Sequence, residues 1–233
     1  ADTNTTPETF ANQVGTLSGT DADTGASLTY GITGGTTGSF TVDTASYDVK
    51  KDAEHSSTTY GTLYLNSTTG AYVFAPVSNQ IDALGGTDTI ELSFDLTVGD
   101  GTVSAGTALQ VSISGKDDQP VVAKEIIKLK DSPAADTFSN QTGLIDAYDV
   151  DSGGLDNRGN LTYGITLGTA LDPAFSDGGI TYTHSKVGTY GTLYLVASGT
   201  DKGKYVYVPN ATAINALSTD ATDTFTINAS DGA

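Results

Sequence analysis

An internal repeat fills most of this chain and limits its fold more than any other feature. Five segments of the first half return in the same order in the second half, about 130 residues later. They are residues 9–13 with 137–141, 28–33 with 161–166, 60–65 with 190–195, 72–76 with 205–209, and 81–84 with 214–217. Because this spacing is the length of a whole domain and exceeds that of a solenoid unit, the sequence predicts two copies of one domain.

The boundary between the copies is predicted within the polar segment 115–120, Gly-Lys-Asp-Asp-Gln-Pro. This turn-forming sequence ends one alternating run, and Val121 and Val122 open the next. The predicted domains are therefore residues 1–118 and 119–233. A chain of 233 residues is long enough for two domains that each bury a core.

Short runs of alternating apolar and polar residues predict an all-β fold. In residues 93–98, Phe94, Leu96 and Val98 fall on one face, and residues 108–113 alternate in the same way. This pattern is typical of antiparallel strands with one face in water. Turn-forming residues at 66–70 and 198–203 predict hairpins. About seven such strands per repeat, with one helical turn near residues 81–84, indicate Greek-key β-sandwiches of the immunoglobulin type.

The negative charge of the chain makes some classes of binding partner unfavourable and others favourable. The formal net charge is −18, and the chain has ten Lys and Arg residues in all. Nucleic acids and anionic membranes need cationic side chains, so neither is an expected partner, whereas a cation is. The absence of Cys excludes disulfides and thiol catalysis. No apolar run approaches ~20 residues, so we expect no membrane insertion here and any export signal or anchor elsewhere.

The second repeat is predicted to lack its last strand. Residues 230–232 correspond to 99–101, and nothing in the second copy corresponds to the run 108–113. Residues 224–229 should then present unpaired backbone groups at a sheet edge. Two outcomes are open: the second domain frays near Ala233, or a strand from a neighbouring molecule fills the vacancy. We expect ~20 further residues, a strand and its linker, to stabilise this domain.

Several short segments of the sequence, taken in order, resemble the recurring motifs of one protein family. They are Asp21-Ala-Asp23 before Leu28-Thr-Tyr30, the hexapeptide 60–65, Tyr205-Val-Tyr-Val-Pro-Asn210, residues 222–232 and residues 115–121. Together they resemble the VCBS repeats of bacterial surface and biofilm proteins, which are related to cadherin-like modules. The chain departs from the family at Asp117, where an Asn is usual. The resemblance implies tandem cadherin-like domains of large RTX-type adhesins at the extracellular bacterial surface, with neighbouring repeats as partners and calcium at the junctions.

Repeated aspartates are the candidate calcium ligands. Calcium takes six to eight oxygen ligands, and an Asp-x-Asp-x-Gly pattern occurs at 21–25 and again at 149–153. In a cadherin-like sandwich this loop meets the loop that follows the penultimate strand. The predicted junction site comprises Asp117, Asp118, Asp149, Asp151 and Asp231, with Asp82 or Asp88 as additional candidates; Asp21, Asp23 and Asp100 form a partial site in the first domain. Alternatively, these are ordinary turn aspartates of an acidic protein.

Other residues give weaker signals. His55 and His184 precede the two Tyr-Gly-Thr-Leu motifs and are either metal ligands or, in the interpretation we favour, polar residues of strand-flanking loops. The tyrosines of segments 60–72 and 190–207 form either a sugar-stacking platform or cross-strand pairs. No nucleophile elbow, His-Glu-x-x-His motif or P-loop is present, so we expect no enzymatic activity.

The leading hypothesis is a pair of calcium-rigidified extender repeats of a bacterial cell-surface adhesin that acts in cell adhesion or biofilm formation. Aspartates crowded at a junction would repel one another until calcium neutralises them and restricts the hinge. The alternative is a carbohydrate- or protein-binding β-sandwich module of a secreted protein, with glycans or other adhesin chains as partners.

Overall fold

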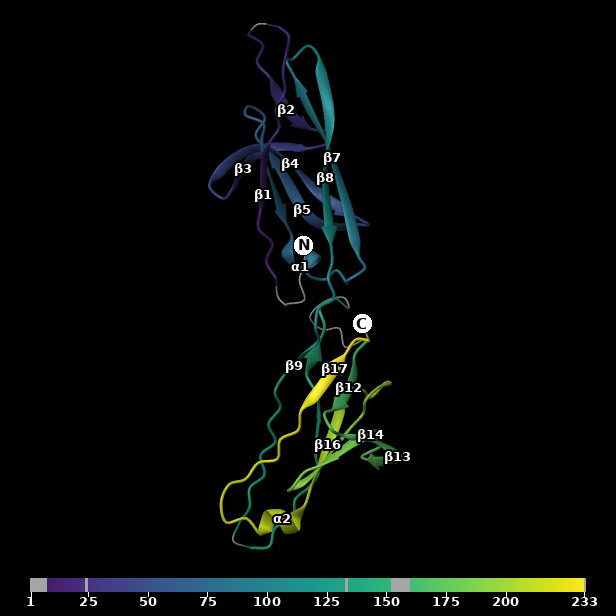
Figure 1. Cartoon of the computed structure of the whole chain (residues 1–233). Coiled ribbons are helices and arrows are strands. Elements are labelled where there is room, and N and C mark those ends of the chain that lie inside the picture. Colours follow the sequence, from purple (N-terminus) through teal and green to yellow (C-terminus); the bar gives the residue numbers. More distant parts are fainter. Residues whose placement is uncertain (1–7, 24, 133, 152–159, 233) are drawn as a thin grey trace. The chain divides into compact units, whose positions relative to one another are not determined.

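The computed structural model describes residues 8–23, 25–132, 134–151 and 160–232. The chain is all-β, with 49% of residues in strands and 4% in helices, and its strands form several antiparallel sheets (Figure 1). It divides into two compact units, Ala1–Asp118 and Gln119–Ala233. Each unit is described by itself.

The first unit consists of two sheets and a single-turn helix. Its elements are β1 (Gln13–Thr16), β2 (Thr29–Ile32), β3 (Thr36–Val42), β4 (Ala45–His55), β5 (Thr58–Leu65), β6 (Ala71–Pro76), α1 (Ser78–Ile81), β7 (Thr89–Gly99) and β8 (Ser104–Ser114). One sheet has the order β1-β6-β5-β4-β3 and the other the order β2-β7-β8. The predicted hairpin at 66–70 is confirmed, since β5 pairs with β6 directly across it.

The core of the first unit lies between these two sheets, as in a β-sandwich. Leu63 of β5 and Phe74 of β6 pack in one cluster with Phe94 and Leu96 of β7. Phe94 and Leu96 are 1% and 2% exposed, which confirms the face that the alternation predicts. The rings of Phe74 and Phe94 meet edge to face with centroids 6.2 Å apart, an arrangement that aromatic pairs prefer.

The second unit repeats this plan with two additions and one omission. Its elements are β9 (Val121–Val122), β10 (Gln141–Leu144), β11 (Ala147–Tyr148), β12 (Thr162–Ile165), β13 (Thr169–Asp177), β14 (Ile180–Val187), β15 (Gly191–Leu195), β16 (Lys204–Pro209), α2 (Ala211–Asn215) and β17 (Ile227–Ser230). The sheet β10-β16-β15-β14-β13 matches the first sheet of the first unit strand for strand. The short pair β11-β9 is additional, and the sheet β12-β17 has two strands where β2-β7-β8 has three.

Side-chain contacts repeat along with the strands. In the first unit the amide of Asn12 donates to Asp43 Oδ2 at 2.6 Å, and in the second unit Asn140 donates to Asp177 Oδ2 at 3.0 Å. In each unit the contact joins the residue just before β1 or β10 to the hairpin formed by β3 and β4 or by β13 and β14. The sequence repeat therefore corresponds to a repeat of structure in tertiary contacts as well as in strand order.

The helical turn differs in position from the sequence-based expectation. Residues 81–84 were the expected turn, whereas α1 ends at Ile81, which is 4% exposed and packs in the core. The Ser78 hydroxyl accepts a hydrogen bond from the backbone N–H of Phe10 at 3.1 Å and so joins the start of α1 to the chain before β1. Glycines at 85 and 86 follow, and glycine disfavours continuation of a helix.

The closing strand of the first unit, β8, has no counterpart among the described residues of the second. Strand β7 pairs with β2 on one side and with β8 on the other, whereas β17 pairs with β12 alone (Figure 1). The expected strand 224–229 begins only at Ile227. The reason is visible in the first unit, where the equivalent residues before Leu96 pair with β8 alone. Without that partner, residues 222–226 form no strand.

Candidate functional site

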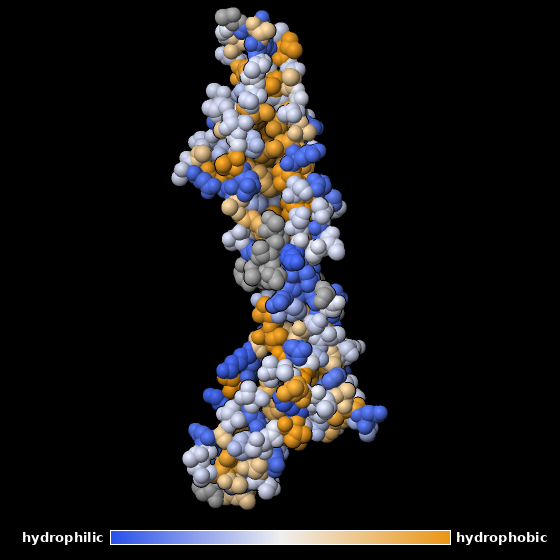
Figure 2. Space-filling model, in the orientation of Figure 1, coloured by the Kyte–Doolittle hydropathy of each residue, from blue (hydrophilic) through white to orange (hydrophobic). Residues whose placement is uncertain are grey.

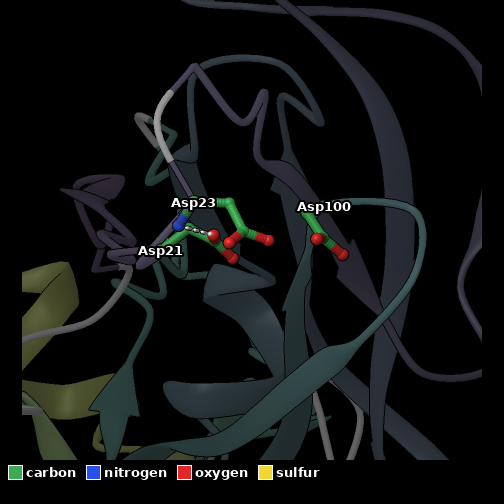
Figure 3. A group of neighbouring side chains, drawn as sticks. All are labelled: Asp21, Asp23 and Asp100. Carbon is green, nitrogen blue, oxygen red and sulfur yellow. Dashed lines mark hydrogen bonds between the residues drawn. The ribbon is translucent and has the colours of Figure 1, made fainter.

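Three aspartates from two loops of the first unit converge at one end of the sheet β2-β7-β8. Asp21 and Asp23 lie in the loop before β2, and Asp100 directly follows β7. The antiparallel pair Thr29 and Gly99 brings these loops to the same end. One carboxylate oxygen of each aspartate lies within 4.8 Å of the other two (Figure 3). The sequence-based grouping of these three residues thus agrees with their positions.

Backbone hydrogen bonds hold two of these carboxylates in place. Asp21 Oδ1 accepts the N–H of Asp23 at 2.7 Å, and Asp100 Oδ1 accepts the N–H groups of Thr102 and Val103 at 2.8 Å each. The hydrogen bond from Val103, followed by that from Thr102, lowers the pKa of Asp100. Asp100 is therefore ionised at neutral pH, with its second oxygen free of these bonds. Asp21 and Asp23 are exposed and Asp100 is half-buried, so an ion could enter from solvent.

The equivalent aspartates of the second unit occupy corresponding places. Asp149 and Asp151 precede β12, and the N–H of Asp151 donates to Asp149 Oδ1 at 3.0 Å, as Asp23 does to Asp21. Asp231 directly follows β17. Asp149 is 1% exposed, whereas Asp151 and Asp231 are half-buried. Gly153, which completes the second Asp-x-Asp-x-Gly pattern, lies outside the described residues.

The strand pair β9-β11 brings the start of the second unit close to Asp149. Val121 pairs with Tyr148, the residue immediately before Asp149. The chain that enters the second unit at Gln119 and Pro120 is therefore held beside the aspartate turn.

The remaining predicted ligands belong to the first unit. Asp118 is 1% exposed, and Asp117 is half-buried with its backbone against Gly86. Asp82 Oδ1 accepts the N–H of Glu8 at 3.1 Å, and Asp88 Oδ2 accepts that of Gly85 at 3.2 Å. Asp82 and Asp88 thus each have a structural role within the first unit. A calcium site that combines ligands from both units stays a prediction.

The histidines lie in strands, so their expected placement in flanking loops is wrong. His55 is the last residue of β4 and is exposed, and His184 lies within β14. His184 Nδ1 is 3.1 Å from the hydroxyl of its neighbour Thr183. Among the described residues, the group suited to a metal contains no histidine. The strands extend to these positions because β4 and β14 form long hairpins with their neighbours.

The repeated tyrosines form contacts within the sheets. Tyr60, Tyr205 and Tyr207 are less than 10% exposed and belong to the cores. On the opposite sheet face, Tyr194 stacks on Phe175 with ring centroids 4.0 Å apart. Tyr64 meets Phe40 edge to face, with ring centroids 5.8 Å apart. The cross-strand interpretation therefore describes these residues better than an exposed sugar-stacking platform.

Comparison of the chain with models of known protein families and with curated proteins found no match. In the parts of the chain that the structure describes, neither helix has the length or the apolar character needed to cross a membrane.

Proposed function

We propose that the chain is a pair of extender modules from a bacterial cell-surface adhesin and that calcium bound by the repeated aspartates stiffens it. Each module would be a Greek-key sandwich of the immunoglobulin-like or cadherin-like type, related to VCBS repeats. The observation that carries this proposal is the convergence of Asp21, Asp23 and Asp100 from two separate loops within 4.8 Å. The repeated order of the sheets supports the modular part.

The chemistry of this group favours calcium over other metals. Calcium accepts six to eight oxygen ligands in flexible geometry, and three carboxylates supply up to six oxygens. Zinc sites in proteins take most of their ligands from His and Cys, which are absent from this group. Magnesium keeps most of its water and binds through one or two carboxylates. Three convergent carboxylates with solvent access therefore fit calcium best.

Mutual repulsion supplies the driving force. Two unit charges 4 Å apart in water interact by roughly 1 kcal/mol, and by more where the surroundings are less polar. Three ionised carboxylates within 4.8 Å therefore destabilise one another in the absence of a cation. A divalent ion converts this repulsion into attraction and ties the loop before β2 to the loop after β7. The same reasoning applies to Asp149, Asp151 and Asp231.

Stiffening between modules requires that a linker take part. The pair β9-β11 holds the first residues of the second unit beside Asp149. Asp117 and Asp118 immediately precede those residues in the chain. Calcium held by the linker aspartates and the loop aspartates together would restrict rotation about the linker. An extender would in this way keep a distant binding domain away from the cell surface.

Calcium titration of single-charge variants tests this proposal. Asp100→Asn should weaken the calcium affinity of the first unit about tenfold or more, because the ligand loses its full charge. Asp95→Asn is the matched control: it removes the same charge, and the exposed Asp95 lies on β7, the strand that Asp100 directly follows. Calorimetric titration of both variants and the parent chain measures the difference. Equal affinity in all three proteins would contradict a calcium site at Asp100.

Thermal unfolding gives an independent test. Calcium at 100 times its dissociation constant should stabilise the protein by about 2.7 kcal/mol if the unfolded chain does not bind it. The melting temperature should then rise with calcium and fall on addition of a chelator. A melting temperature that responds to neither would contradict the proposal.

A further inference from the structure

Two exposed apolar side chains of the second unit lie where the first unit has a glycine and an aspartate. Leu167, in the turn between β12 and β13, is 87% exposed, and Val187, at the end of β14, is 76% exposed. The repeat makes Gly34 the counterpart of Leu167. The strand registers make Asp52 the counterpart of Val187. Gly34 and Asp52 are exposed as well, so both positions belong to the surface in each unit.

Leu167 has a backbone conformation that suits glycine. Its φ is 59°, in the left-handed region that bulky residues rarely adopt. Gly34 has a φ of 70° at the same place, where glycine meets no steric penalty. A leucine with 87% of its surface exposed also gains little from burial. Leu167 thus has a conformational cost without a matching gain in packing, as residues at functional positions often do.

The outermost strand of the same sheet, β13, carries a second difference between the units. Its ladder with β14 is interrupted by a bulge of four residues, 171–174, with the sequence Leu-Asp-Pro-Ala. At the equivalent place β3 has two residues, Gly38 and Ser39. Residues 172–174 are all exposed. Bulges redirect side chains at sheet edges, and this one presents an acidic and two apolar side chains to solvent.

We propose that these residues together form a contact surface for a second copy of the chain. The surface, called the β13 corner below, has two ends. One end consists of Leu167, Val187 and Lys186, and the other consists of the bulge residues 172–174. None of these side chains has a counterpart of the same kind in the first unit except Lys186, which corresponds to Lys51.

The two ends of the β13 corner complement one another. The ammonium of Lys186 lies beside Leu167, because it donates to the carbonyl oxygen of Thr166 at 2.9 Å. This bond uses one of the three donors of an ammonium group. The other end carries the exposed carboxylate of Asp172. In a contact with twofold symmetry, Lys186 of each copy meets Asp172 of the other, and Leu167 packs on Pro173.

Charge also favours this place for an encounter between copies. The formal net charge of the chain is −18, so two copies repel one another over most of their surfaces. The β13 corner carries one cation and one anion and can be approached with less repulsion. Addition of a strand to the edge of β13 is disfavoured, because Pro173 has no N–H and the bulge interrupts the edge. The copies therefore meet through side chains.

The contact is small, and we expect it to be weak. Apolar residues reach the surface of the second unit in small groups among hydrophilic ones (Figure 2). Stable interfaces bury roughly 800 Å² on each partner, which is more than a few side chains supply. A dissociation constant of about 0.1–1 mM is typical of such a contact. Within a surface array, where copies are held close together, a contact of this strength becomes occupied.

Sedimentation equilibrium of the intact chain tests the proposal. We expect reversible dimerisation at concentrations up to about 1 mM. The methyl NMR signals of Leu167, Val187 and Ala174 should shift as the concentration rises. The measurement is made in excess chelator, so its failure would leave the calcium proposal untouched. A chain that stays monomeric at about 1 mM would overturn the proposal.

Single substitutions test whether the β13 corner is the contact. Val187→Asp copies the first unit and should weaken the dimer at least about tenfold, because a charge enters an apolar contact. Val14→Asp is the matched control, since Val14 is also 76% exposed but lies on β1 of the first unit. Leu167→Gly should weaken the dimer without lowering the melting temperature, because glycine suits this φ. Equal effects of Val187→Asp and Val14→Asp, or no effect of Leu167→Gly on dimerisation, would overturn the proposal.

Exchange of the two charges tests the twofold arrangement. Asp172→Lys brings two lysines together at each end of the contact, and Lys186→Glu brings two acids together, so neither variant should dimerise with itself. An equimolar mixture of the two variants should dimerise, because each lysine then meets an acid. A mixture that stays monomeric, with both variants as thermally stable as the parent chain, would overturn the proposal.

Discussion

The hydroxyl of Tyr207 donates a hydrogen bond to Asp223 Oδ2 at 3.3 Å, where the first unit has two apolar side chains. Phe74 is the counterpart of Tyr207 in the repeat, and the strand register makes Leu92 the counterpart of Asp223. A polar pair has therefore replaced an apolar pair at one place in the fold. The aromatic contact is kept, since the rings of Tyr207 and Phe225 lie 6.0 Å apart at 62°.

Asp223 also connects the segment before β17 to the turn before β15. Its carboxylate accepts the N–H groups of Thr189 and Tyr190, each at 2.8 Å. The aspartate thus anchors a segment that has no strand partner.

The Tyr207 pair predicts a pH dependence of the second unit. Burial, and then the charge and hydrogen bond of Asp223, raise the pKa of Tyr207 to about 12, against about 10 for an unfolded tyrosine. The folded state thus favours the neutral phenol. The neutral Tyr207 phenol contributes fully to the stability of the folded state below pH 10, and this contribution is lost between pH 10 and about 12. The unfolding free energy should fall less steeply over this range in Tyr207→Phe than in the parent chain.

Titration of individual tyrosines by NMR checks the cause. Asp223→Asn should lower the pKa of Tyr207 but leave it above 10, because burial, the larger influence, is retained. Tyr205, whose pKa is raised by burial and by Glu125, serves as an internal reference. An unchanged pKa of Tyr207 in Asp223→Asn would show that the carboxylate has no influence.

Close contact between glycine and an aromatic ring predicts a stability effect in the first unit. A Cβ at Gly61 would lie 2.3 Å from Cζ of Phe74, whose ring is fixed against Phe94. Gly61→Ala should destabilise the unit by about 1–3 kcal/mol, as overpacking does. At Gly106 the nearest atom to a Cβ is 3.4 Å away. Gly106→Ala should accordingly be neutral or stabilising by about 0.5–1 kcal/mol. Similar denaturation midpoints for the two variants would contradict this packing argument.

The open edge predicts unequal hydrogen exchange between equivalent strands. In the first unit the N–H groups of Phe94 and Leu96 are turned toward β8, whereas those of Phe225 and Ile227 are turned away from β12, to the side where no strand pairs among the described residues. We expect exchange at Phe225 and Ile227 to be faster than at Phe94 and Leu96 by about tenfold or more. Equal protection at the equivalent positions would mean that the edge is already covered.

Much of the fold can be predicted from the sequence because strand alternation and the repeat are local signals. Phe94 and Leu96 fall on the buried face that their spacing predicts. The start of β17 could not be predicted so well. Residues 224–226 have the alternation of a strand, but strand formation also needs a partner, and the partner is not part of the pattern.

The functional residues could be predicted from the sequence only in part. The grouping of Asp21, Asp23 and Asp100 follows from the pairing of the two strands that carry their loops. Before the structure, only the resemblance to cadherin-like sandwiches implied that these loops meet. The pair Tyr207 and Asp223 was missed, although a signal existed: two apolar residues of one copy are both polar in the other. When two positions differ together between the repeats, the two side chains are expected to be in contact. The equivalence of Asp223 and Leu92, however, follows only from the strand register that the structure shows.

Residual dipolar couplings measured for both units of the intact chain, with saturating calcium and then with excess chelator, test the central claim most directly. Calcium-restricted rotation about the linker predicts that the two units share one alignment tensor when calcium is bound and have tensors of different magnitude in chelator. Tensors that differ equally in both conditions, with calcium shown by calorimetry to be bound, would contradict the claim that calcium stiffens the chain.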